Sequence, residues 1–107
     1  MALREIQKQV DEWIKQYPEG YWSPHVVMTQ LQEEAGEVAR EVMRRFGPKR
    51  PKADDTAGDL DEEIGDCIFT LCCLANPNGI DLDEAFAKTM AKRYGRDRDR
   101  FPRHDAH

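Results

Sequence analysis

Hydrophobic residues recur every three or four positions along most of the chain, which is the spacing of the apolar face of an amphipathic α-helix. The pattern predicts four helices, over residues 3–17, 24–46, 59–76 and 82–95. Asp81 followed by Glu84 resembles a capping box at the start of the fourth helix. No alternating strand pattern and no internal repeat interrupts this periodicity. The predicted fold class is therefore all-α, with a four-helix bundle-like architecture.

Glycine and proline residues separate the predicted helices. Gly47 and Pro48 end the second helix, and residues 47–58, which lack periodicity, are predicted to form a loop. Residues 67–75 of the third helix are apolar on nearly every side and are expected to be the most buried part of the fold. Three cysteines lie there in a spacing that fits neither a disulfide framework nor a zinc site. They are predicted to be reduced core residues: Cys67, Cys72 and Cys73.

The length of 107 residues fits one domain, which we place at residues 1–101, followed by a short tail at 102–107. Charged residues make up 35% of the chain, and the net charge of −5 argues against binding to a nucleic acid polymer. The N-terminus lacks the apolar core of a signal peptide, and no apolar run approaches the length of a membrane span. A cytoplasmic location without a membrane partner is therefore expected. Because a small chain buries a modest core, dimerisation could complete it.

Acidic residues gather on two of the predicted helices. The second helix carries three glutamates on one face: Glu33, Glu34 and Glu37. The third helix carries an acidic stripe at three- and four-residue steps: Asp59, Glu62, Glu63 and Asp66. Like charges at this spacing destabilise a helix, so the stripes favour a bound counter-charge, and Mg²⁺ prefers such oxygen ligands. The three histidines lie far from both stripes, which argues against a di-iron centre. Two solvated acidic faces are the alternative interpretation.

The order of these acids is also distinctive. Glu33-Glu34-x-x-Glu37, followed after 25 residues by Glu63-x-x-Asp66, resembles the EExxE…ExxD signature of MazG-like nucleotide pyrophosphohydrolases, the all-α NTP pyrophosphatases. The resemblance extends from the first helix to about Phe101. It implies a Mg²⁺-dependent enzyme, with Mn²⁺ as a substitute, that converts a nucleoside or deoxynucleoside triphosphate and water into the monophosphate and pyrophosphate. It also implies assembly as a homodimer or a dimer of dimers.

The resemblance implies roles for individual acids. Carried over position by position, it makes four residues the metal ligands: Glu34, Glu37, Glu63 and Asp66. Glu33 would be a further ligand or a carboxylate that orients water. Since neighbouring negative charges raise the pKa of a carboxyl group, a carboxylate left partly uncompensated by the metal could also serve as a general base. Glu33 and Glu37 are the candidates for this catalytic role.

Four further residues are candidates for substrate binding. Lys92 and Arg96 match basic positions of the last helix of the family, which suggests contacts to phosphate, although ordinary solvated helix charges would look the same. Trp22 could stack on a base or could simply pack, whereas Trp13 fits the core stripe of the first helix. Asn76 resembles a family asparagine near the nucleotide, but helices also often end at asparagine.

Two functional classes follow from these observations. The leading hypothesis is a nucleotide pyrophosphohydrolase. The alternative is a non-catalytic helical dimer that binds nucleotide or metal and regulates a partner. Because every acid of the signature is present, the enzyme is favoured over both this alternative and a purely structural bundle.

Overall fold

The structure is a computed structural model that describes residues 2–49 and 58–104. Within these residues it contains helices and no strand: α1 (Leu3–Ile14), α2 (Pro24–Phe46), α3 (Leu60–Ala75), the short 3-10 helix η1 (Asn76–Asn78) and α4 (Leu82–Tyr94). The all-α prediction is confirmed. Asp81 caps α4 as predicted, because its side chain accepts hydrogen bonds from the backbone N–H groups of Asp83 and Glu84. Most of the predicted loop, residues 50–57, lies outside the described part of the chain.

The first helix is shorter than predicted. Helix α1 ends at Ile14, and a series of turns carries the chain to Gly20. Gly20 adopts a φ of 66°, a left-handed conformation that glycine enters without a steric penalty. The turn brings Tyr21 and Trp22 back alongside the end of α1, immediately before α2 begins.

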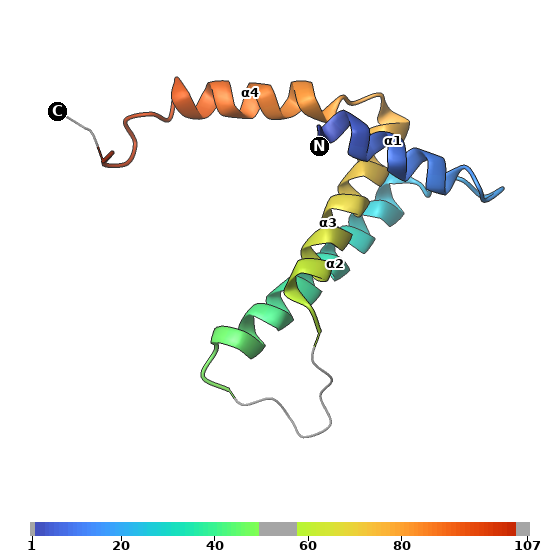
Figure 1. The fold of residues 1–107 in the computed structure, drawn as a ribbon, viewed down its shortest axis with the longest axis horizontal. Coiled ribbons are helices and arrows are strands. Elements are labelled where there is room, and N and C mark those ends of the chain that lie inside the picture. The colour runs from blue at the N-terminus through green and yellow to red at the C-terminus, as the bar shows by residue number, and fades with distance from the viewer. Residues whose placement is uncertain (1, 50–57, 105–107) are drawn as a thin grey trace.

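Helices α2 and α3 form an antiparallel pair, α1 packs across one end of this pair, and α4 packs on α1 and extends away from the rest of the chain (Figure 1). The radius of gyration is 17.8 Å, whereas a compact domain of about 100 residues has a value of about 13 Å. The four predicted helices therefore exist, but a single chain does not close them into a compact globule.

A buried amide joins α1 to the start of α4. The side-chain nitrogen of Gln7 donates to the Asn76 side-chain oxygen at 2.9 Å and to the Ile80 carbonyl at 2.8 Å. Its side-chain oxygen accepts from the backbone N–H of Leu82 at 2.9 Å. In return, the Asp83 carboxylate accepts from the backbone N–H groups that begin α1. These bonds satisfy groups that a helix end leaves unpaired, and so fix α4 against α1.

The hydrophobic core is small. Among the described residues, four apolar side chains are buried: Val10, Val27, Cys72 and Ala75. Residues 67–75 are only partly buried, contrary to expectation, because the described part of the chain leaves exposed the side of α3 that carries Ile68 and Leu71. All three cysteines are free thiols as predicted, although only Cys72 is a core residue.

Large apolar side chains remain exposed on two surfaces. One surface lies on α2 and α3 and carries Val42, Met43, Phe46, Ile64, Ile68 and Leu71. The other lies on α4 and the segment after it and carries Phe86, Met90, Tyr94 and Phe101. Isolated exposed apolar residues are common on protein surfaces, but grouped ones mark contact sites. None of the described helices is both long enough and apolar enough to cross a membrane.

Candidate metal and nucleotide site

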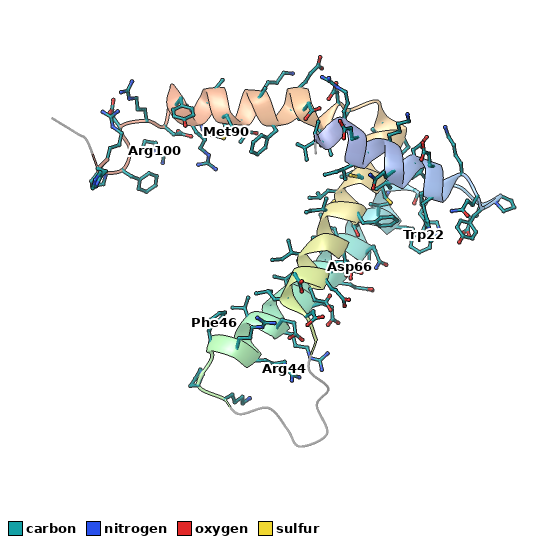
Figure 2. All side chains as sticks on the ribbon, in the orientation of Figure 1. Trp22, Arg44, Phe46, Asp66, Met90 and Arg100 are labelled. Carbon is teal, nitrogen blue, oxygen red and sulfur yellow. The ribbon has the colours of Figure 1, made fainter. Side chains whose placement is uncertain are left out.

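Three carboxylates meet between α2 and α3. Glu34 projects from α2, and Glu63 and Asp66, one helical turn apart, project from α3. One oxygen from each side chain lies within 4.8 Å of the others. The cluster sits midway along the helix pair, where Figure 2 labels Asp66. The antiparallel pairing of α2 with α3 therefore brings together acids that are about 30 residues apart in the sequence.

Glu63 lies in an environment that disfavours its charged form. Burial raises the pKa of the Glu63 carboxyl above its ordinary value, and the negative charges of Glu37, Asp66 and Glu34 raise this pKa further. This influence places Glu37 near Glu63, although its oxygens lie outside the three-residue cluster. Glu37 also forms an ion pair with the Arg40 guanidinium at 3.6 Å. A cation bound among these carboxylates would offset the repulsion between their negative charges.

The donor set fits a hard divalent cation. All three groups offer carboxylate oxygens, which Mg²⁺ prefers, with bonds of about 2.0–2.1 Å. Two ligands on opposite sides of such an ion lie about 4.2 Å apart. The 4.8 Å spread of the cluster therefore requires only small side-chain rotations to close around one ion.

The other acids of the two stripes lie elsewhere. Glu33, Asp59 and Glu62 are exposed and do not belong to the cluster. Sequence reasoning missed Glu41, one turn beyond Glu37, which is only 4% exposed and forms an ion pair with Arg44 at 3.9 Å. The Glu41 carboxylate lies close to the segment that leads into α3. A Cβ atom added at Gly58 would come within 2.5 Å of one Glu41 oxygen.

An aromatic pocket of about 480 Å³ adjoins the carboxylate cluster. It lies between α1, the turn that follows α1, α2 and α3. Glu34 and Asp66 form part of its wall, and five aromatic side chains line it: Trp13, Tyr17, Tyr21, Trp22 and Phe69. Apolar and aromatic walls with a few polar groups are typical of small-molecule sites. The pocket and the carboxylates therefore form one continuous site.

Both tryptophans of the chain face this pocket. Trp22, a predicted substrate residue, lines it with 49% of its surface exposed, and its indole N–H donates to the Glu19 carboxylate at 3.2 Å. Trp13 is 50% exposed and packs edge-on against Phe69, with ring centroids 5.7 Å apart. Its assignment to the core is wrong, because helical periodicity identifies an inward face without showing whether that face meets a core or a pocket.

Asn76 does not line the aromatic pocket but supports it from behind. Its side-chain nitrogen donates to the backbone carbonyl of Gln7 at 3.0 Å and to the Tyr21 hydroxyl at 2.9 Å. The Tyr21 hydroxyl in turn donates to the Asp11 carboxylate at 2.6 Å. The amide of Asn76 therefore holds the Tyr21 ring at the pocket wall.

Lys92 and Arg96 lie far from the carboxylates of the same chain. Lys92 is on the last turns of α4 and Arg96 follows that helix, which runs away from the α2–α3 pair (Figure 1). The Arg96 guanidinium donates to the largely buried Asp97 carboxylate at 2.9 and 3.3 Å. Among the described residues, no lysine or arginine lines the aromatic pocket. One chain thus places its acids and its candidate phosphate ligands in separate regions.

An all-α chain that combines carboxylates from two antiparallel helices with an adjoining aromatic pocket has the features of a helical nucleotide hydrolase. Residues 22–101 match the model of the MazG nucleotide pyrophosphohydrolase domain. The chain belongs to the MazG nucleotide pyrophosphohydrolase family and is accordingly a nucleotide pyrophosphohydrolase.

The chain is also similar to individual proteins and solved structures. YpjD of Bacillus subtilis is 47% identical over 102 residues, which cover 95% of this chain and 92% of YpjD. YvdC of the same organism is 31% identical, over 88% of this chain and 97% of YvdC. The crystal structure of YpjD superimposes with a TM-score of 0.77 over 86% of this chain and 94% of that chain. The crystal structure of the Bacillus-conserved MazG protein, a nucleotide pyrophosphohydrolase, is 40% identical, with a TM-score of 0.75 over 86% of this chain and 88% of that one.

Proposed function

We propose that this protein is a Mg²⁺-dependent pyrophosphohydrolase that converts nucleoside or deoxynucleoside triphosphates into the monophosphate and pyrophosphate. One observation carries the proposal: oxygens of Glu34, Glu63 and Asp66 converge within 4.8 Å, and two of these residues, Glu34 and Asp66, also line a pocket with aromatic walls. The carboxylates supply a cation site, and the pocket supplies a surface on which a base can stack.

Glu34, Glu63 and Asp66 would hold the metal, and Glu37, beside Glu63, would complete the ligand set. A bound Mg²⁺, or Mn²⁺ in its place, would offset the negative charge of the polyphosphate, polarise a phosphoryl oxygen and acidify water. Without such a cation, the carboxylates would repel the substrate.

The protein's own side chains would do the rest. Trp22 and Trp13 would hold the base, and the aromatic wall would exclude water from it. Glu37 is the better candidate for the general base, because it lies next to the cluster and has two carboxylate oxygens, so that one could bind the metal while the other accepts a proton. Glu33, which is exposed, would orient the attacking water from the solvent side.

A second copy of the chain would complete the site. The exposed apolar surfaces on α2, α3 and α4 favour a homodimer, or a dimer of dimers, in solution. Because Lys92 and Arg96 do not reach the carboxylates of their own chain, their contacts to phosphate would be made in the site of the second copy. Light scattering should therefore give at least twice the mass of one chain, and a monomer would contradict this arrangement.

Mixing two inactive variants tests the shared site. One variant carries Lys92→Met and Arg96→Met, and the other carries Asp66→Asn. After unfolding and refolding as a 1:1 mixture, half of the dimers contain one chain of each kind, and each of these has one intact site. About a quarter of the native activity should return. No recovery would place the basic residues outside the site of the second copy.

The central experiment is an activity assay. Purified protein is incubated with a panel of nucleoside and deoxynucleoside triphosphates and Mg²⁺, and the release of monophosphate and pyrophosphate is measured. Glu37→Gln and Asp66→Asn should reduce turnover by about 100-fold or more. Glu62→Gln, an exposed acid on α3 outside the cluster, is the matched control and should retain activity. Binding of nucleotide without hydrolysis would instead support the non-catalytic alternative.

A further inference from the structure

Gln30 connects the aromatic pocket to the carboxylate cluster. It lies on α2 one turn before Glu34, and both side chains line the pocket. The side-chain nitrogen of Gln30 donates a hydrogen bond to one carboxylate oxygen of Glu34 at 2.7 Å, in a partly buried position. A short bond from an amide to a charged acceptor restricts the rotation of both side chains.

This bond also fixes which end of the amide faces Glu34. An ionised carboxylate can only accept hydrogen bonds, so the amide of Gln30 has to turn its NH₂ group toward Glu34. The amide oxygen then points away from the carboxylate, and no described residue donates a hydrogen bond to it. Because Gln30 is among the residues that line the pocket, its amide oxygen is an acceptor available to an occupant, and its orientation is set by a predicted metal ligand.

Other polar groups of the wall are already engaged as donors. The Thr70 hydroxyl donates to the backbone carbonyl of Asp66 at 2.8 Å. The Tyr21 hydroxyl donates to Asp11, and the Trp22 indole N–H donates to Glu19. Near the carboxylates, the wall is consequently better supplied with free acceptors than with free donors. An occupant that brings its own N–H donor would fit this wall best.

We propose that Gln30 is a positioning residue for Glu34 and a specificity-determining residue for the base. Its nitrogen orients the Glu34 carboxylate toward the metal, and its oxygen accepts a hydrogen bond from an exocyclic amino group. The substrate class is therefore nucleotides whose base carries an amino group at the ring position where uracil and hypoxanthine carry a carbonyl, that is, cytosine or adenine. This inference deepens the proposed function and rests on it.

Binding measurements test the inference without depending on hydrolysis. The chain has two tryptophans, and both line the pocket, so tryptophan fluorescence reports its occupation directly. The probes are the α,β-methylene analogues of CTP and UTP, titrated in the presence of Mg²⁺. The native protein should bind the cytidine analogue about 10-fold more tightly than the uridine analogue. Separately, electron paramagnetic resonance measures the affinity for Mn²⁺ without nucleotide.

Gln30→Met keeps the length of the side chain and removes both hydrogen-bonding groups. It should bring the cytidine-to-uridine ratio close to one and weaken Mn²⁺ binding about 10-fold, the usual effect of losing a residue that orients a metal ligand. Gln32→Met makes the same change at an exposed position of α2 and should alter neither quantity. Gln30→Asn, which is too short to reach Glu34, provides a second variant with the same expected losses.

The inference is overturned if the native protein binds both analogues equally. It is also overturned if the folded Gln30 variants keep either the binding ratio or the Mn²⁺ affinity within about twofold of the native values. A protein that binds the analogues selectively but releases no pyrophosphate from CTP would contradict the proposed function and leave the assignment of Gln30 intact.

Discussion

Replacing Tyr21 by phenylalanine removes a single oxygen atom that joins three parts of the fold. The hydroxyl donates to the Asp11 carboxylate of α1 at 2.6 Å and accepts from the Asn76 side chain, at the end of α3, at 2.9 Å. A typical hydrogen bond contributes about 1 kcal/mol to stability, and one to a charged partner contributes more. Both partners keep other contacts, since Asp11 pairs with Lys15 and Asn76 bonds to Gln7.

We therefore expect Tyr21→Phe to lower the free energy of unfolding by about 2 kcal/mol at pH 8. The measurement is urea unfolding at a fixed protein concentration, because the stability of an oligomer depends on concentration. The variant should also bind nucleotide more weakly, since the hydroxyl anchors the turn that carries Trp22 to the pocket. A loss of stability below about 0.5 kcal/mol would refute the role assigned to this hydroxyl.

The same hydroxyl gives a signature in the pH dependence. Burial, together with the hydrogen bond to Asp11, raises the pKa of Tyr21 from 10.0 to about 12. The folded state therefore holds this proton more tightly than the unfolded state, and the stabilisation is complete below pH 10. It is lost as the pH rises from about 10 to about 12. The stability difference between the native protein and Tyr21→Phe should thus narrow between pH 8 and pH 11, and a constant difference would contradict the argument.

Three further predictions address other parts of the site. In EDTA, Glu63→Gln should melt at a higher temperature than the native protein, because burial and neighbouring carboxylates disfavour the charged form of Glu63. The variant should also lose most of the stabilisation by Mg²⁺, and thermal melts with and without the metal check both effects. Gly58→Ala should destabilise the fold by about 1–3 kcal/mol in urea unfolding, because the added methyl group would displace the buried carboxylate of Glu41. A variant as stable as the native protein would contradict the close packing of Glu41 against Gly58. Trp13→Ala should lower the free energy of unfolding by about 1–2 kcal/mol, less than the 3–5 kcal/mol typical of a core tryptophan, because the side chain is half exposed. It should nevertheless weaken nucleotide binding at least 10-fold, because Trp13 lines the pocket. A loss of stability typical of a core residue, with unchanged binding, would refute its place in the pocket.

Much of the site could be predicted because helical geometry connects sequence spacing directly to direction. Residues three or four apart share a face, so the order of the acids was enough to place Glu63 beside Asp66. The same rule placed Glu33 and Glu34 on one broad face without separating them. In the structure Glu34 faces α3 and Glu33 faces solvent, a difference that depends on how α2 is rotated against its neighbour. That rotation is a property of packing, and no local pattern contains it.

The sequence by itself determined the number of helices, their approximate ends and the family to which the chain belongs. These features follow from the periodicity of apolar residues, from turn residues and from the spacing of five acids, all of which act within one or two helices. Only the tertiary structure decided that Trp13 lines a pocket, that Gln30 holds Glu34 and that Asn76 supports Tyr21. It also decided that α4 carries Lys92 and Arg96 away from the acids of its own chain. Each of these facts depends on contacts between segments of the chain that fold into place together, and those contacts are set by how side chains fill space and satisfy their hydrogen bonds.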